Sequence, residues 1–181
     1  GDAGQLGIGA MAENVLDTLK VKVSIGQFYG IEINDFAVTV ARTALWIAES
    51  QMLKETEEIV HMHMDFLPLT AYANIVEGNA LQVDWKTVVP VNKLNYIMGN
   101  PPFVGASMMS AEQKAEAVSI FGKIKLSNSI DYVGAWYYKA AELLANTSIR
   151  AAFVSTNSIT QGEQVAPLWG TLYSKYRIHI D

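Results

Sequence analysis

The stretch Tyr96-Ile97-Met98-Gly99-Asn100-Pro101-Pro102-Phe103-Val104 joins an apolar run to an Asn-Pro-Pro-aromatic sequence. The apolar residues predict a buried strand. The two prolines predict a rigid, extended loop after it, because proline fixes φ and disfavours helix in the preceding residue. A plain strand-to-loop exit would produce the same pattern, so the neighbouring sequence has to decide whether the loop has a function.

The polar and aromatic groups of this loop suit one class of ligand. Asn100 carries an amide oxygen that accepts hydrogen bonds, Pro101 offers a carbonyl, and Phe103 presents a flat apolar face. Pro102 keeps Pro101 extended. These groups together suit a planar ligand with an exocyclic amine, such as a nucleobase.

Composition limits the function classes. A chain of 181 residues with 50% hydrophobic and 17% charged residues is sufficient for one globular domain with a real core. Its sequence contains no apolar run of membrane-spanning length and no secretion signal at its start, and it has no cysteine, which fits a cytoplasmic protein. The net charge of −5 argues against this segment gripping DNA by itself.

Strand and helix patterns alternate along the chain. A strand at residues 28–33 precedes a helix that Asn34 or Asp35 caps and that runs to about Leu53. Residues 21–25 are compatible with a strand or an extended linker. Further strands are expected at 72–76, 94–98, 151–155 and from 177, and further helices at 10–20, 110–121, 130–145 and 163–174. The buried helix faces are expected to be Phe36, Val40, Ala44 and Ile47; Ala111, Ala115 and Val118; Val133, Tyr137, Ala140 and Leu144; and Val165, Leu168 and Leu172.

This alternation predicts an α/β fold with a doubly wound, mostly parallel, Rossmann-like sheet and helices on both faces. Ligands of such sheets bind at the carboxyl ends of the strands, where Glu32, Asn79 and Asn100 are expected. An acidic residue in the position of Glu32 suits both hydroxyls of a ribose, and Ile33 suits an adenine face. An exposed charge at a strand end is the plainer interpretation of Glu32.

His61, His63 and Asp65 form the one cluster with metal-ligand character. Alternate histidines without a third well-spaced ligand are typical of loops and surfaces. We therefore predict no metal site in this segment.

Several blocks of the sequence resemble the motifs of one enzyme family. The central Asn-Pro-Pro-Phe is shared with methyltransferases of RNA and of protein glutamine, whereas residues 155–159 followed by Gln-Gly-Glu-Gln at 161–164 narrow the resemblance to DNA enzymes. The chain resembles the methyltransferase region of MmeI-like restriction-modification enzymes. The matching blocks are Gly30-Ile31-Glu32-Ile33 with residues 41–48, Gly78-Asn79-Ala80-Leu81, Gly99 to Phe103, Asp131-Tyr132-Val133 with Trp136-Tyr137, and residues 153–162.

The resemblance implies a chemistry and a set of site residues. It implies methyl transfer from S-adenosylmethionine to the exocyclic N6 of an adenine flipped out of double-stranded DNA, with the DNA held by regions outside this chain. The alternatives are a catalytically inactive nucleotide-binding or interaction module, or an RNA or protein methyltransferase. The implied catalytic residues are Asn100, Pro101, Pro102 and Phe103, and the implied cofactor-binding residues are Glu32, Ile33, Asn79 and Ala80.

The family's first strand and its Gly-rich cofactor turn have no counterpart here, because no strand precedes Gly7-Ile8-Gly9. We therefore expect residues 1–181 to be a partial methyltransferase domain, truncated at both ends and inactive by itself. The slot of the absent strand is expected to be closed, filled by residues 21–25, or paired by another chain. The sequence makes no prediction of oligomeric state.

Overall fold

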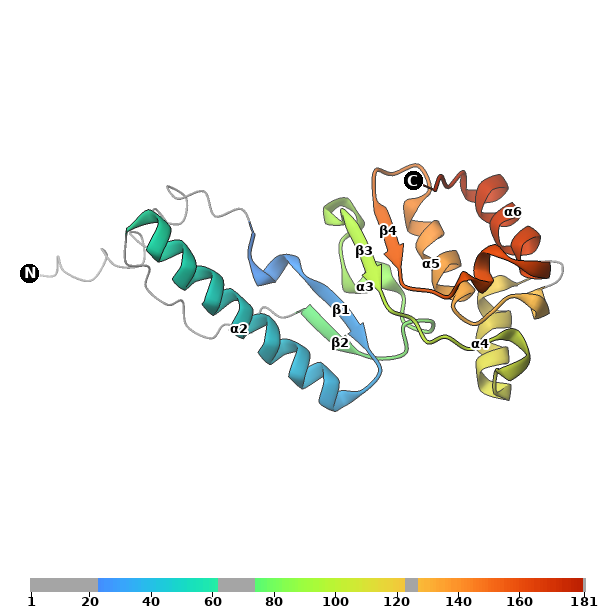
Figure 1. Ribbon diagram of the computed structural model, residues 1–181, viewed down its shortest axis with the longest axis horizontal. Helices are drawn as coiled ribbons and strands as arrows, with labels where there is room; N and C mark the ends of the chain where they lie inside the picture. Colours follow the sequence, from blue (N-terminus) through green and yellow to red (C-terminus); the bar gives the residue numbers. More distant parts are fainter. Residues whose placement is uncertain (1–22, 62–73, 123–126, 181) are drawn as a thin grey trace, which may run out of the picture. The chain divides into compact units, whose positions relative to one another are not determined.

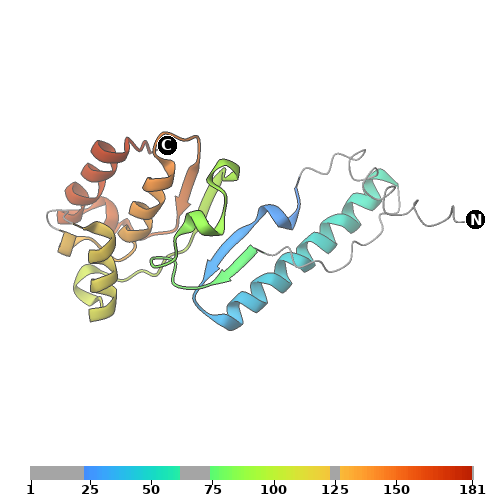
Figure 2. The ribbon, with the colours of Figure 1, turned by 180° about the vertical axis from the view of Figure 1, so that it is seen from behind.

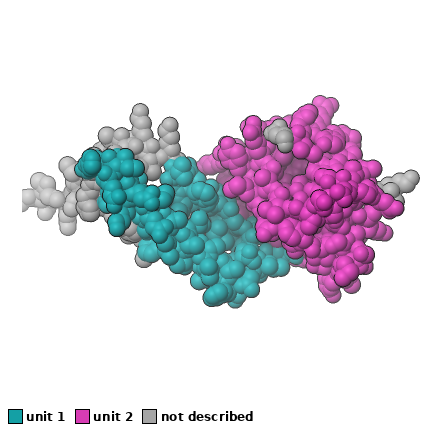
Figure 3. All heavy atoms as spheres, in the orientation of Figure 1, with its two compact units in different colours: residues 1–79 teal, residues 80–181 magenta. Residues whose placement is uncertain are grey.

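The computed structural model describes residues 23–61, 74–122 and 127–180. The chain divides into two compact units, residues 1–79 and 80–181 (Figure 3). We call them unit 1 and unit 2 and describe each by itself. The predicted helix at 10–20, the Gly7-Ile8-Gly9 turn, and the His63 and Asp65 pair lie outside the described residues.

Unit 1 is a parallel strand pair with one long helix along it. Its described elements are the 3-10 turn η1 (Ile25–Gln27), strand β1 (Tyr29–Glu32), helix α2 (Asp35–Val60) and strand β2 (Asn74–Glu77). β1 pairs with β2 in register from Tyr29↔Asn74 to Glu32↔Glu77. Helix α2 contacts both strands (Figures 1 and 2). The predicted strand at 28–33 is thus confirmed within slightly narrower bounds.

The ends of α2 show which part of its prediction was right. The side chain of Asn34 accepts a hydrogen bond from the N–H of Ala37 at 2.9 Å, so Asn34 is the N-cap. The helix continues past Leu53 to Val60 and ends where His61 adopts the left-handed conformation at φ 54°. The expected end at Leu53 was wrong, because the Lys and Glu residues of 54–58 are good helix formers on an exposed surface.

The buried face of α2 differs from the predicted one. Phe36 is 74% exposed, and Val40 and Ile47 are also exposed, whereas Val38 is buried. The side of α2 that meets the strands and η1 also carries two polar groups that bond to backbone. Arg42 donates to the carbonyl of Ile75 at 2.6 Å. Glu49 accepts from the N–H of Ile25 at 3.2 Å. These hydrogen bonds, together with Val38, orient the helix and leave the apolar face through Phe36 open.

Unit 2 contains four helices and a second parallel strand pair. Strand β3 (Tyr96–Gly99) pairs with β4 (Arg150–Phe153) in register from Tyr96↔Arg150 to Gly99↔Phe153. The helices are α3 (Trp85–Val88), α4 (Ala111–Phe121), α5 (Gly134–Leu144) and α6 (Val165–Tyr176), and the 3-10 turns are η2 (Val91–Lys93), η3 (Ala106–Met108), η4 (Ser127–Ser129), η5 (Asn157–Thr160) and η6 (Gly162–Gln164).

Helix α5 lies at the centre of unit 2, in contact with α4, α6 and β4. Its buried residues surround most of its circumference, so the single buried face predicted for it was too narrow. The core contains Leu81, Met109, Ala117, Phe121, Ile130, Tyr132, Val133, Ala135, Tyr138, Ala141, Ile159, Leu168 and Leu172.

The predicted start of α4 is confirmed, but its predicted buried face is wrong. Ser110 and Gln113 form the expected capping box, with the N–H of Gln113 donating to Ser110 Oγ at 3.2 Å and the N–H of Ser110 donating to Gln113 Oε1 at 3.0 Å. The helix buries Ala117 and Phe121, whereas the predicted Ala111, Ala115 and Val118 are exposed. The aromatic Phe121 joins the α5 core, which turns the Ala117 side inward.

The strand expected from Arg177 is absent from residues 177–180. Arg177 takes the left-handed conformation at φ 55° and its N–H donates to the carbonyl of Tyr173 at 3.1 Å. The N–H of Ile178 donates to the carbonyl of Leu172 at 3.3 Å, so the chain folds back over the end of α6 and a left-handed cap ends the helix.

The parallel pairing predicted for the sheet is confirmed in both units. The described residues form two separate two-stranded sheets, β1–β2 in unit 1 and β3–β4 in unit 2. Residues 23 and 24 have no regular structure and residues 25–27 form η1, so they do not fill a strand position. A single doubly wound sheet with helices on both faces stays a prediction.

Candidate functional site

In unit 1, the ends of β1 and β2 meet at Glu32. The carbonyl of Glu32 accepts the N–H of Gly78 at 2.8 Å, which fixes the backbone just before Asn79. The half-buried Glu32 side chain accepts the N–H of Asn34 through Oε1 at 2.9 Å. Ile33 is exposed beside it. The parallel pairing therefore brings Glu32, Ile33 and the Gly78-Asn79 turn to one edge, as predicted.

The next residue, Ala80, begins unit 2 and belongs to a turn held by two side chains. The indole N–H of Trp85 donates to the Ala80 carbonyl at 2.8 Å. Lys139 of α5 donates to the carbonyls of Leu81 and Val83 at 3.0 and 2.6 Å. Burial lowers the pKa of Lys139 against the opposing attraction of nearby carboxylates. Sequence reasoning missed Lys139, because a lysine inside an aromatic helix gives no sign of its distant partners.

The Asn-Pro-Pro-Phe loop follows β3, and three of its four residues are exposed. Asn100 and Pro102 are exposed, Pro101 is buried, and Phe103 is 50% exposed. At the start of the loop, the Gly99 carbonyl accepts the N–H of Val154 at 3.0 Å, which extends the β3–β4 ladder by one bond. Pro101 is therefore an anchor, whereas Asn100 and Phe103 are available to a ligand.

Gly99 allows this strand end to pack closely. A Cβ at Gly99 would lie 3.2 Å from the ring of Phe153, its register partner in β4. The same ring makes a T-shaped contact with Tyr137 of α5, at 5.2 Å between centroids. The strand end that carries the loop is thus packed onto the central helix.

Beyond Phe103 the loop is attached to the segment before α5. The Val104 carbonyl accepts the N–H of Tyr132 at 2.9 Å. The N–H of Ala106 donates to Asp131 Oδ1 at 2.9 Å. The loop is therefore held at both ends.

Asp131 is the centre of a hydrogen-bond network. Its Oδ2 accepts Ser158 Oγ at 2.6 Å and Gln164 Nε2 at 2.8 Å, while its own N–H donates to Gln164 Oε1 at 3.0 Å. Partial burial opposes ionisation of the Asp131 carboxyl, but the hydrogen bonds from Gln164, Ser158 and Ala106 outweigh it and lower the pKa. The family resemblance included the blocks at Asp131 and at residues 153–162, but it did not predict the hydrogen bonds between them.

The segment after β4 is also fixed on α5 and α6. Tyr137 Oη lies 3.1 Å from Ser155 Oγ. The indole N–H of Trp169 donates to the Ile159 carbonyl at 2.7 Å. The family-like block at 153–162 therefore lies beside the strand that carries Asn100, as two neighbouring parallel strands require.

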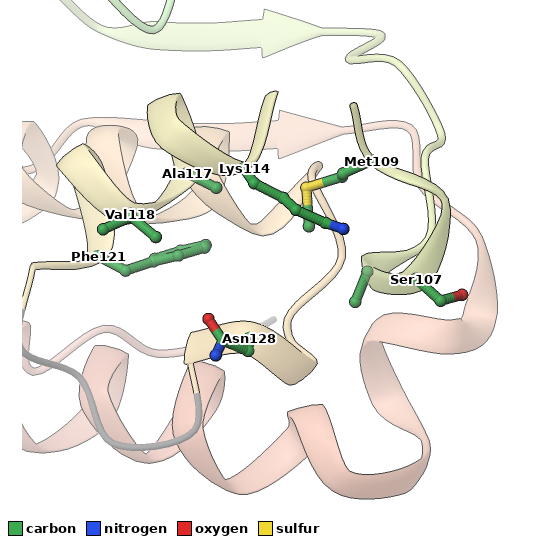
Figure 4. Close-up of a pocket in the computed structure, with 8 residues that line it drawn as sticks. Ser107, Met109, Lys114, Ala117, Val118, Phe121 and Asn128 are labelled. Carbon is green, nitrogen blue, oxygen red and sulfur yellow. The ribbon is translucent and has the colours of Figure 1, made fainter. Parts of the chain in front are cut away.

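A pocket of about 430 Å³ lies between α4 and the segment around η3 (Figure 4). In Figure 4, Lys114 extends from α4 toward Ser107 and Met109. None of the predicted site residues lines the pocket. Its lining is Ala106, Ser107, Met109, Lys114, Ala117, Val118, Phe121 and Asn128.

The predicted site residues divide between the units. Glu32, Ile33 and Asn79 belong to unit 1, whereas Ala80 and the Asn100–Phe103 loop belong to unit 2.

Across residues 23–61, 74–122 and 127–180, no cluster of three metal-ligating side chains occurs. No helix in the same ranges is long and apolar enough to cross a membrane.

Comparisons with known proteins relate the chain to one family. Residues 6–181 match the family described as MmeI, DNA-methyltransferase domain. DNA methyltransferase A of Bacillus subtilis (strain 168) is 45% identical over 162 residues, which cover 88% of this chain and 18% of that protein. The solved structure of the Type IIL restriction-modification enzyme MmeI in complex with DNA is 44% identical, with a TM-score of 0.80, and covers 85% of this chain and 21% of that one.

The chain therefore spans about a fifth of the length of the relatives reported above. The match extends over nearly the whole sequence and includes the Asn-Pro-Pro-Phe loop and the blocks before and after it. It confirms the resemblance to the methyltransferase region of MmeI-like enzymes that the motifs indicated. The chain belongs to the family of MmeI DNA-methyltransferase domains.

Proposed function

We propose that this chain is part of an enzyme that transfers a methyl group from S-adenosylmethionine to the exocyclic N6 of adenine in DNA, within a restriction-modification system. The observation that carries the proposal is the mounting of the Asn100–Phe103 loop. The loop is anchored by buried Pro101 and held at both ends, and it presents Asn100 and Phe103 to solvent.

Two oxygens of the loop suit the target amine. The Asn100 side-chain oxygen and the Pro101 carbonyl accept the two amine hydrogens, which directs the nitrogen lone pair away from the loop. A loop that is already rigid pays little entropy to hold the amine in this geometry. Phe103 stacks on the base, since its face is half accessible.

The target base must leave the DNA stack before these groups reach it. The energy of unstacking is offset by stacking on Phe103 and by the hydrogen bonds to the amine. Because the chain has a net charge of −5, the phosphate contacts come from other parts of the protein.

The edge of unit 1 fits the adenosine part of S-adenosylmethionine. The carboxylate of Glu32 is oriented by the Asn34 N–H and has acceptor capacity for the ribose hydroxyls. The exposed side chain of Ile33 suits one face of the adenine, and Asn79 and Ala80 follow the strand end next to it. When bound, S-adenosylmethionine supplies an activated methyl group; the residues of this chain orient the acceptor amine.

The test is Asn100→Ala in the full-length protein that carries this chain. Methyl transfer to DNA should fall at least about 100-fold, because the variant loses an acceptor that orients the reacting nitrogen. Affinity for S-adenosylmethionine should stay close to the wild-type value, because Asn100 contacts the base and not the cofactor. Nucleoside mass spectrometry of the treated DNA should detect N6-methyladenine.

Asn92→Ala is the matched control, since Asn92 is an exposed asparagine of unit 2 in η2. It should leave activity unchanged. N4-methylcytosine as the product would contradict the adenine assignment, and full activity of Asn100→Ala would contradict the role of the loop. Methylation of RNA or protein in place of DNA would overturn the substrate class.

A further inference from the structure

The hydrogen bonds at the two ends of the Asn100–Phe103 loop belong to one closed circuit in unit 2. At the start, Gly99 accepts from Val154, the residue after β4, at 3.0 Å. Beyond the end, Ala106 donates to Asp131 Oδ1 at 2.9 Å. The other oxygen of Asp131 accepts from Ser158 and Gln164, in the segment that follows Val154. The carboxylate therefore joins the loop after β3 to the loop after β4.

The two prolines stiffen the part of this circuit that contains Asn100. Pro101 and Pro102 have fixed φ angles, so the loop has little freedom to absorb a displacement of its far end. A shift at Ala106 is transmitted along Val104 and Phe103 toward Asn100. A misplacement of about 1 Å from a distant substitution can cost about 100-fold in rate.

We propose that Asp131 is a positioning residue for methyl transfer, whose carboxylate holds the amine-binding loop in register with the segment that contains Ser158 and Gln164. The proposal rests on the proposed function, because it assigns Asp131 to the same site. It gives a chemical role to two blocks whose family resemblance alone did not explain their residues.

The charged form of Asp131 is required by the donors around it. Three donors converge on the two oxygens: the Ala106 N–H, the Ser158 hydroxyl and the Gln164 amide. The Gln164 amide is oriented by two further bonds, since Oε1 accepts the Asp131 N–H at 3.0 Å and Nε2 also donates to the Ser158 carbonyl at 2.9 Å. An asparagine at 131 that keeps its oxygen on Ala106 directs its NH₂ group at the NH₂ group of Gln164.

The experiment is Asp131→Asn in the full-length protein, with kcat, KM for DNA, cofactor affinity and melting temperature measured together. We expect kcat to fall about 10- to 100-fold, while cofactor affinity and melting temperature change little. Ser158→Ala removes one of the two donors to Oδ2 and should give a smaller loss of kcat in the same direction. Glu163→Gln is the matched control, because it neutralises an exposed carboxylate next to Gln164 and should leave kcat unchanged.

A second measurement tests the circuit without relying on activity. Amide hydrogen exchange at residues 103–106 should be faster in Asp131→Asn than in the wild type, whereas exchange in the middle of α5 should be unchanged. Equal exchange in both proteins would overturn the proposal, as would an unchanged kcat. Losses of kcat, cofactor affinity and melting temperature in proportion would show a structural role and also overturn it. A wild-type protein that methylates no DNA would instead contradict the proposed function, and the exchange comparison would still decide the role of Asp131.

Discussion

The two units hold their candidate site residues by different means. Unit 2 places the Asn100–Phe103 loop on a continuous core around α5, in which Ile130 and Leu168 are almost inaccessible. Unit 1 buries only Ile25, Val38 and Ile75 among its described hydrophobic residues, and α2 exposes Phe36 and Ile59. Its site residue Glu32 is positioned mainly by backbone hydrogen bonds and by the Asn34 cap.

This contrast indicates which candidate site residues are held most firmly. Side chains fixed by close packing resist displacement, whereas those fixed by a two-stranded ladder share the low stability of that ladder. The loop that is proposed to orient the amine has the rigid support. The edge proposed for the adenosine lies on the weaker unit, so its order depends more on what binds to it.

The largest expected effect comes from replacing one isoleucine by alanine in each unit and comparing the losses of stability. Ile130→Ala, at a fully buried position in unit 2, should lower the free energy of unfolding by about 2–5 kcal/mol because it leaves a cavity. Ile59→Ala, at a position 78% exposed on α2, should change it by less than about 0.5 kcal/mol. Urea denaturation followed by circular dichroism measures both. Equal losses would show that α2 is as tightly packed as α5 and would remove the contrast.

Two glycines of unit 2 test how tightly the core around α5 is packed. A Cβ on Gly134, at the start of α5, would collide with Cγ2 of buried Ile130 and lie 3.5 Å from Phe121. Gly134→Ala should therefore destabilise the protein by about 1–3 kcal/mol. Gly170→Ala, in α6 with no atom within 4 Å of the new Cβ, should stabilise it by about 0.5–1 kcal/mol. Thermal unfolding distinguishes the signs, and a neutral Gly134→Ala would mean that the α5 core adjusts easily.

The sequence was most informative where the controlling interactions are local. The Asn34 cap, the Ser110–Gln113 capping box and the position of the strand before Asn100 depend on neighbouring residues, and all three were confirmed. The expected burial of that strand was wrong, because Tyr96 and Met98 are 68% and 77% exposed. The inward faces of α2 and α4 were wrong because distant partners determine them. Arg42 binds a carbonyl 33 residues away, and no periodicity reveals this contact.

The candidate site shows the same limit. The residues expected to touch ligands could be named from motifs, and the strand ends that carry them could be placed in each unit. The side chains that hold those strand ends, Asp131 and Lys139, were not predicted. Their partners lie 25 to 58 residues away, so only the folded chain identifies them.

The smallest expected effect concerns the negative charge of Asp131 in unit 2. The pKa of Asp131 is lower in the folded protein than its ordinary value near 3.8. The unfolded chain therefore takes up the proton first as the pH falls, so the carboxylate stabilises the fold above its ordinary pKa, and this contribution is lost as the pH falls through the lowered value. The melting temperature of the wild type should exceed that of Asp131→Asn only slightly at pH 6, in keeping with the small change expected of this variant, and the difference should shrink toward pH 3. The other carboxyl groups titrate in both proteins and cancel in the comparison. Parallel curves from pH 6 to pH 3 would show that the charge of Asp131 adds nothing to the stability of unit 2, and the contrast between the units would then rest on packing and on hydrogen bonds that do not depend on charge.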